Sequence, residues 1–256
     1  MNTESNTLQK NGLESKLLNK EFFLQILNRD QLKYIAIILM TLGHWALKLA
    51  KYGKLRALLK FAVSAEFFAP PVFFFFIAEG FHYTKSPKKY AIRLLICAVI
   101  TQIPHTLVLP DHTLKTFLLQ WNVIMTLFLG LLALIVIHST LELWQRILAV
   151  TGLLVVSRLI MSEWWVSGII IILCFDLLRE KPLKRFLAVE VLIIIAMIFQ
   201  VGVPDLRIFT YYYLPPMLAV VAITFFYNGN KGHFPQVSKY FFYVWYPLHL
   251  LIELFI

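Results

Sequence analysis

The feature that most constrains this chain is a succession of apolar stretches, each about as long as a membrane is thick. A transmembrane helix needs about 20 predominantly apolar residues to cross the hydrocarbon core. Of the 256 residues, 59% are hydrophobic, whereas a soluble domain averages about 45–50% apolar residues. We therefore predict an all-α fold, a polytopic transmembrane helix bundle in the lipid bilayer, with about nine spans: 32–50, 61–81, 89–109, 118–138, 146–161, 164–178, 184–200, 208–226 and 238–256.

The spans are predicted to form one domain, residues 32–256, preceded by a polar tail, residues 1–31. The tail has no apolar segment followed by a small-residue cleavage site, so we predict no removable signal peptide. The fifth and sixth spans are short, and only Ser162 and Glu163 separate them. This spacing predicts a tight hairpin between two short helices.

The basic residues lie mostly in alternate loops between the apolar stretches. The formal net charge is +10, which favours nucleic-acid binding in a soluble protein. Here the clusters in the tail, in 85–93 and in 179–185 are typical of cytoplasmic loops, so we expect no nucleic-acid partner. They place the N-terminus in the cytoplasm and, with nine spans, the C-terminus outside. The segment Lys48–Lys60 disagrees, because its five basic residues fall on the predicted outer side.

Histidines within two spans are candidate general bases. A polar residue inside a span costs roughly 2.5–3.5 kcal/mol on insertion scales and usually faces a partner or a cavity. His44 lies in the first span, where it either bonds a neighbouring helix or acts as a base. In the last span, Tyr246, His249 and Glu253 are spaced three and four residues apart and share one helix face. We expect Glu253 to orient the His249 ring, although an aromatic belt with a peripheral histidine also fits.

Glu79, near the end of the second span, is a third candidate catalytic residue, and its charge requires a partner. Arg93 follows the next loop, so we predict that the two side chains meet near the cytoplasmic face and shape a polar chamber. A loop lysine is the alternative partner. The two cysteines, Cys97 and Cys174, each lie in an apolar run without metal-ligand spacing, so we predict no metal site.

The fourth span carries small and polar residues at every fourth position. Asn122, Thr126 and Gly130 therefore lie on one helix face. Such a face is mostly a packing seam between helices. Asn122, at its end, is also a candidate contact for substrate.

Five segments, found in order from about Leu32 to Leu251, resemble the TraX family of membrane proteins. The segment with EGFHYT followed by KKYAIRLL, and the terminal FYVWYPLHL, are the more specific of them. The family's namesake is linked to N-terminal acetylation of F-type pilin. The matching segments are LKYIAIILMTLGHW, FFAPPVFFFFIAEGFHYTKSPKKYAIRLLI, NVIMTLFLGLLAL, WWVSGIIIILCF and YFFYVWYPLHLLI.

The resemblance implies a multi-pass acyltransferase of the bacterial cytoplasmic membrane. It implies acetyl-CoA as acyl donor and a membrane-delivered peptide, pilin-like or saccharide acceptor with a free amine or hydroxyl. The family pattern has an Asp directly before the first-span histidine, where this chain has Gly43, so we predict that His249 is needed for the chemistry more than His44 alone. The residues that fall on the family's motif positions are His44, Glu79, Arg93, Asn122, Tyr246 and His249.

Within such an enzyme a histidine would deprotonate the acceptor, and Asn122 or Tyr246 would donate a hydrogen bond to the oxyanion. The basic loops 85–93, with Lys88 and Lys89, and 179–185 would hold the phosphates of acetyl-CoA. Two other classes of protein stay open. Broken helices with intramembrane charges also suit a transporter or permease, and Gly43 leaves open a non-catalytic membrane assembly or immunity protein.

Overall fold

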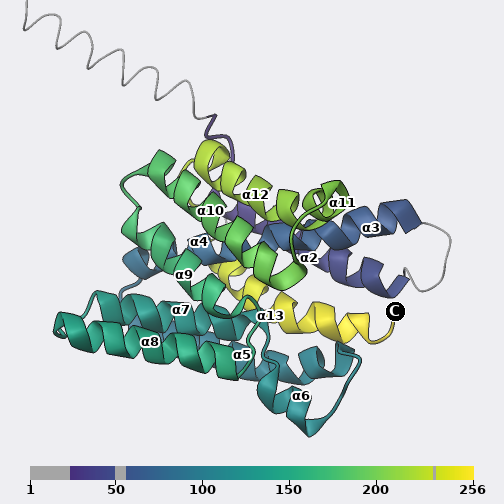
Figure 1. Cartoon of the computed structure of the whole chain (residues 1–256), viewed down its shortest axis with the longest axis horizontal. Coiled ribbons are helices and arrows are strands. Elements are labelled where there is room, and N and C mark those ends of the chain that lie inside the picture. Colours follow the sequence, from purple (N-terminus) through teal and green to yellow (C-terminus); the bar gives the residue numbers. More distant parts are fainter. Residues whose placement is uncertain (1–23, 50–55, 233–234) are drawn as a thin grey trace, which may run out of the picture.

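The computed structural model describes residues 24–49, 56–232 and 235–256. Most residues in these ranges are helical, and the only strand-like pairing among them is an isolated bridge between Leu27 and Tyr227 (Figure 1). Most of the predicted tail, residues 1–31, and the centre of the disagreeing segment Lys48–Lys60 lie outside the described ranges.

Every predicted span coincides with a helical segment. Four segments are long and apolar enough to cross a membrane: Ala62–Tyr83, Pro87–Val108, Leu114–Ile137 and Leu206–Phe226. The all-helical, membrane-type fold is therefore confirmed, and nine crossings stay a prediction. The helices are α2 (Arg29–Leu49), α3 (Arg56–Ala65), η2 (Glu66–Phe68), α4 (Ala69–Tyr83), α5 (Pro87–Val108), α6 (Leu114–Leu119), α7 (Val123–Ile137), α8 (Leu143–Leu159), α9 (Trp165–Leu177), α10 (Pro182–Val201), α11 (Leu206–Ile208), η3 (Phe209–Tyr213), α12 (Leu214–Val221), η4 (Ala222–Phe226) and α13 (Pro235–Glu253).

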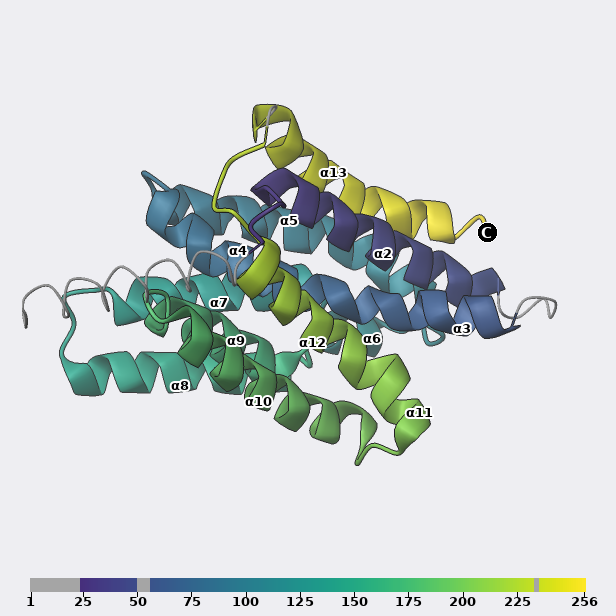
Figure 2. The ribbon, with the colours of Figure 1, turned by 90° about the horizontal axis from the view of Figure 1, so that it is seen from above.

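The helices lie side by side, and their connections gather at two opposite ends (Figures 1 and 2). The turns after α4, α7 and α9 lie at one end, and α3, α11 and the C-terminus lie at the other. The first end carries the loop lysines and arginines of 85–89 and 179–185, so we call it the basic end. This arrangement is the one that alternating basic loops predict for a bundle with a cytoplasmic face.

The tight hairpin predicted between the fifth and sixth spans is present. It joins α8 to α9 through Ser162, Glu163 and Trp164, and Trp164 adopts a left-handed backbone conformation with φ 60°. The hairpin is anchored to α7, because the Thr126 hydroxyl forms hydrogen bonds with Ser162 Oγ (3.0 Å) and with the Glu163 carbonyl. Glu163 is thereby fixed at the end of the bundle opposite the basic end.

The predicted packing seam on α7 is also present. A Cβ added at Gly130 would collide with the Ile172 side chain of α9, and one added at Gly168 of α9 would lie 2.6 Å from Thr126 Cγ2. The two glycines therefore let α7 and α9 approach closely, as small residues do between membrane helices.

Gly168→Ala is expected to destabilise the protein by about 1–3 kcal/mol, because the added methyl overpacks the contact with Thr126 and Phe74. Gly152→Ala on α8 is the matched control: a Cβ there meets nothing within 4 Å, and alanine favours helix by up to about 1 kcal/mol. Thermal unfolding in detergent compares the two. Equal melting temperatures would show that the α7–α9 contact does not depend on Gly168.

Candidate functional site

A cavity of about 520 Å³ opens near the basic end, between α2, α4, α5 and α13. We call it the basic chamber, because its charged lining consists of Arg29, Lys33, Arg93 and Lys231 against a single carboxylate, Asp30. The Arg93 guanidinium lies 5.7 Å from the centre of the Tyr90 ring. Its Nε is buried and has no hydrogen-bond acceptor, so the chamber offers an unsatisfied cationic donor.

A second cavity, of about 490 Å³, contains the residues nearer the opposite end. We call it the acidic chamber, because two carboxylates and two histidines line it and no Lys or Arg is among its described lining residues. Its aromatic wall includes Trp121, Trp164 and Trp165. The four ionisable residues are His44, Glu66, His105 and Glu163.

The two chambers meet at a shared wall. Phe73, Val123 and Tyr246 line both cavities. Tyr246 is the one residue of the three with a hydrogen-bonding side chain. A group bound in one chamber is therefore separated from a group in the other chamber by a thin wall. That wall is mostly apolar, and its one hydroxyl is that of Tyr246.

His44 lines the acidic chamber and is oriented by Glu253. Its Nδ1 lies 3.2 Å from Glu253 Oε2, across the contact between α2 and α13. The Glu253 side chain is only 3% exposed, and that of His44 is 26% exposed. A buried carboxylate bonded to one ring nitrogen leaves the other nitrogen of a partly exposed ring available as a base.

The prediction that Glu253 orients His249 is wrong. His249 Nδ1 instead lies 3.2 Å from the Trp245 carbonyl of its own helix. The reason is that α2 packs against α13 and brings the His44 ring to the Glu253 carboxylate. His249 is fully buried and its Nε2 has no partner. Its ring packs edge-on against His44 and Tyr246, with 5.2 Å between centres in both cases.

Glu66 occupies the space beside Gly43. A Cβ added at Gly43 would lie 2.8 Å from Glu66 Oε2. Glu66 reaches this place because a 3-10 turn, Glu66–Phe68, leads into α4, whose first turn contains Pro70 and Pro71. A carboxylate from a different helix thus fills the position that a larger residue at 43 would take.

The opposite wall of the acidic chamber pairs His105 with Glu163. His105 Nε2 lies 3.0 Å from Glu163 Oε1. Burial acts to raise the pKa of the Glu163 carboxyl, but the hydrogen bond and charge of His105 and the charge of His44 hold it below its ordinary value. The nearby Arg158 guanidinium lies over the Trp165 ring, 4.9 Å from the ring centre.

Residues 28–256 match the family model described as TraX protein. The chain belongs to the TraX family. It is 31% identical to a probable fimbrial assembly protein, FimC of serogroup H1, from Dichelobacter nodosus, over 87% of this chain and 92% of that protein. No solved structure matches the chain.

The segments that carry the TraX resemblance surround the two chambers. They fall on α2, on α4 with the start of α5, on α7, on α9 and on α13. Helices α2, α4, α5, α7 and α13 contribute lining residues to the basic chamber. Helix α9 packs against α4 and α7, and its first residue, Trp165, lines the acidic chamber. The α10 segment, absent from those motifs, adds only Gln200 to the acidic chamber.

The predicted pair of Glu79 and Arg93 is not formed. Glu79 Oε1 accepts a hydrogen bond from the Tyr227 hydroxyl at 2.7 Å, and no ion pair joins it to Arg93, both being described residues. The two side chains line different cavities: Glu79 faces one of about 400 Å³ that also contains Arg179 and Arg185. Glu79 lies on α4 and Arg93 on α5, and each helix directs its side chain into a different cavity, an effect that loop length does not reveal.

The Asn122 side chain connects the start of α7 to α5. Its amide donates to the Ala98 carbonyl and to Gln102 Oε1, each at 2.9 Å, and its carbonyl accepts from the Ile124 backbone at the start of α7. Both N–H groups are therefore used, so Asn122 has no donor left for an oxyanion. Lys88 and Lys89 are exposed at the start of α5 and do not line the basic chamber.

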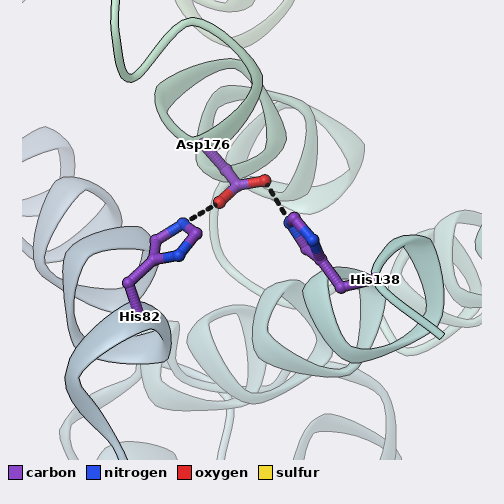
Figure 3. Close-up of side chains that lie close together, drawn as sticks. All are labelled: His82, His138 and Asp176. Carbon is purple, nitrogen blue, oxygen red and sulfur yellow. Dashed lines mark hydrogen bonds and ion pairs between the residues drawn. The ribbon is translucent and has the colours of Figure 1, made fainter.

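Sequence reasoning missed a further cluster, His82, His138 and Asp176, in which the Asp176 carboxylate lies between the two rings (Figure 3). It also missed Glu66, Glu163 and Lys33 as lining residues. A signal for His138 was present: the step of four through Thr126 and Gly130 continues to that residue.

Proposed function

We propose that this TraX protein transfers an acetyl group from acetyl-CoA to an amine or hydroxyl of a membrane-delivered acceptor. The observation that carries the proposal is the meeting of a basic and an acidic chamber at Tyr246, beside the His44–Glu253 pair. One chamber suits an anionic donor, the other a polar acceptor. Their contact point is where acyl transfer requires a base.

The donor side of the proposal rests on the cations of the basic chamber. Phosphate oxygens are well matched by Arg and Lys donors, and the unsatisfied Nε of Arg93 is such a donor. Lys33 Nζ lies 4.6 Å from the centre of the Phe76 ring, which keeps its charge inside the chamber. We therefore propose that the phosphates are bound in the basic chamber and not by the exposed loop lysines. The proposed contacts are Arg29, Lys33, Arg93 and Lys231.

In the proposed chemical step, His44, Glu253 and Tyr246 each have one task. His44 takes the proton of the acceptor N–H or O–H as that atom attacks the thioester carbonyl. Glu253 holds the ring and stabilises the imidazolium, and the Tyr246 hydroxyl donates to the oxyanion. The C–S bond then breaks, and the proton on His44 passes to the departing CoA thiolate.

The relative and the fold support the acceptor class and the location that we propose. A similar protein bears the name of a probable fimbrial assembly protein, which favours a peptide or pilin-like acceptor; a saccharide is the alternative. With the basic end in the cytoplasm, acetyl-CoA would enter from there and the acceptor from the opposite side. We place the protein in the bacterial cytoplasmic membrane with nine crossings.

A transporter is the second candidate, because two chambers separated by a thin wall also suit alternating access. The two π-helical turns beside α12, Phe209–Tyr213 and Ala222–Phe226, are irregular backbone of the kind that transporters use. A non-catalytic assembly protein is the third. Specific binding of acetyl-CoA distinguishes the proposed enzyme from both.

Purified protein is expected to bind acetyl-CoA, and Lys33→Gln or Arg93→Gln is expected to weaken that binding about 10- to 100-fold, the effect of losing one charge-assisted hydrogen bond. Lys89→Gln is the matched control, since Lys89 is exposed outside the chamber. Isothermal titration in detergent measures all three. No binding by the wild-type protein, or equal weakening in the control, would contradict the proposal.

A further inference from the structure

We propose that His82, His138 and Asp176 form a binding site for one divalent transition-metal ion of the Zn²⁺ class at the basic end of the bundle. The three ligand atoms come from three segments that pack on one another: the last turn of α4, the residue that ends α7, and the last turn of α9. The site is distinct from the two chambers, because none of the three residues lines either of them.

The geometry converges on one point (Figure 3). Asp176 Oδ1 lies 2.5 Å from His82 Nε2, and Asp176 Oδ2 lies 2.8 Å from His138 Nε2. All the candidate ligand atoms lie within 4.8 Å of one another. Atoms bound to one tetrahedral ion at about 2.0–2.2 Å are about 3.3–3.6 Å apart, so a small rotation of the rings that widens the two nitrogen–oxygen distances admits an ion between them.

The charge balance favours a cation. The Asp176 side chain is 2% exposed, and among the described residues it forms ion pairs only with these two histidines. Histidines that bind a metal ion are neutral, and the desolvation of a buried carboxylate is costly without a counter-charge. A divalent ion supplies that charge. Two imidazole nitrogens and one carboxylate are ligands that Zn²⁺ accepts, whereas Mg²⁺ and Ca²⁺ prefer oxygen ligands alone.

The helix packing holds the site in place before any ion binds. Gly168, Ile172 and Asp176 recur every four residues on α9, and the first two contact Thr126 and Gly130 of α7. The contact between α7 and α9 continues to the ends of both helices, where Asp176 lies beside His138. Access is open as well: His82 and Asp176 line the cavity of about 400 Å³ that contains Glu79, and the His138 side chain is 43% exposed.

The test is metal binding by the full-length protein, purified in detergent with an affinity tag that is not polyhistidine. After incubation with Zn²⁺ and removal of free metal, elemental analysis is expected to give about one ion per chain. Asp176→Asn, His82→Gln and His138→Gln should each lower retention at least tenfold, because loss of a residue that only supports a ligand already costs about 10- to 100-fold in metal affinity. His112→Gln, a histidine outside the cluster, should retain the ion.

Co²⁺ provides the readout that does not depend on the variants folding. Bound to the wild-type protein, it is expected to give ligand-field bands that Zn²⁺ displaces. An increase in melting temperature with Zn²⁺ should appear in the wild type and in His112→Gln only. No stoichiometric binding at micromolar Zn²⁺ to the wild-type protein, or equal retention by Asp176→Asn, would overturn the site and leave the cluster as a hydrogen-bonded clamp between three helices.

Discussion

Replacing His44 by alanine is expected to lower acetyl transfer by about 10²–10⁴-fold, the usual contribution of a general base. The protein should still insert and purify normally, because the ring is partly exposed in the acidic chamber. The measurement uses radiolabelled acetyl-CoA and cell-envelope fractions, with mass spectrometry identifying the molecule that gains an acetyl group. A fully active His44→Ala protein would remove His44 from the mechanism.

The same assay tests how Glu253 and His249 relate to His44. Glu253→Gln should lower transfer by about 10² or more, because the amide favours the wrong imidazole tautomer. Combined with His44→Ala it should add little, since residues that act as one unit are not additive. His249→Ala should cost less than His44→Ala. A larger loss for His249→Ala, in protein that folds normally, would restore the original sequence-based preference for His249 as base.

Glu66→Ala is expected to lower acetyl transfer about 10- to 100-fold, as loss of a carboxylate that supports a functional histidine does. Glu66 reaches the space beside Gly43 that a larger side chain at position 43 would occupy. Gly43→Asp alone should also be impaired, because its side chain collides with Glu66. The double variant Gly43→Asp with Glu66→Ala should recover most of the activity.

The matched control is Gly43→Asn with Glu66→Ala. The asparagine restores the side-chain volume beside His44 without the charge. If only the variant with Gly43→Asp recovers activity, the carboxylate charge is required. Equal recovery by both variants would indicate a packing role only. Full activity of Glu66→Ala alone would show that His44 needs no second carboxylate besides Glu253.

The sequence by itself determined which segments form helices and how they alternate between the two ends. Apolar stretches of membrane length leave the backbone no alternative to internal hydrogen bonding, and each predicted span coincides with a helix. Local spacing was also sufficient for the α8–α9 hairpin and for the seam at Thr126 and Gly130. These features depend on residues near one another in the chain.

Only the tertiary structure decided which side chains meet. Glu253 lies four residues from His249 in the sequence, yet its partner is His44, 209 residues away. Glu79 and Arg93 flank one loop but point into different cavities. Asp176 gains two histidine partners from helices that precede it by 38 and 94 residues. The physical reason is that a helix presents its side chains around its full circumference, and which direction becomes a site depends on the neighbouring helices packed against it.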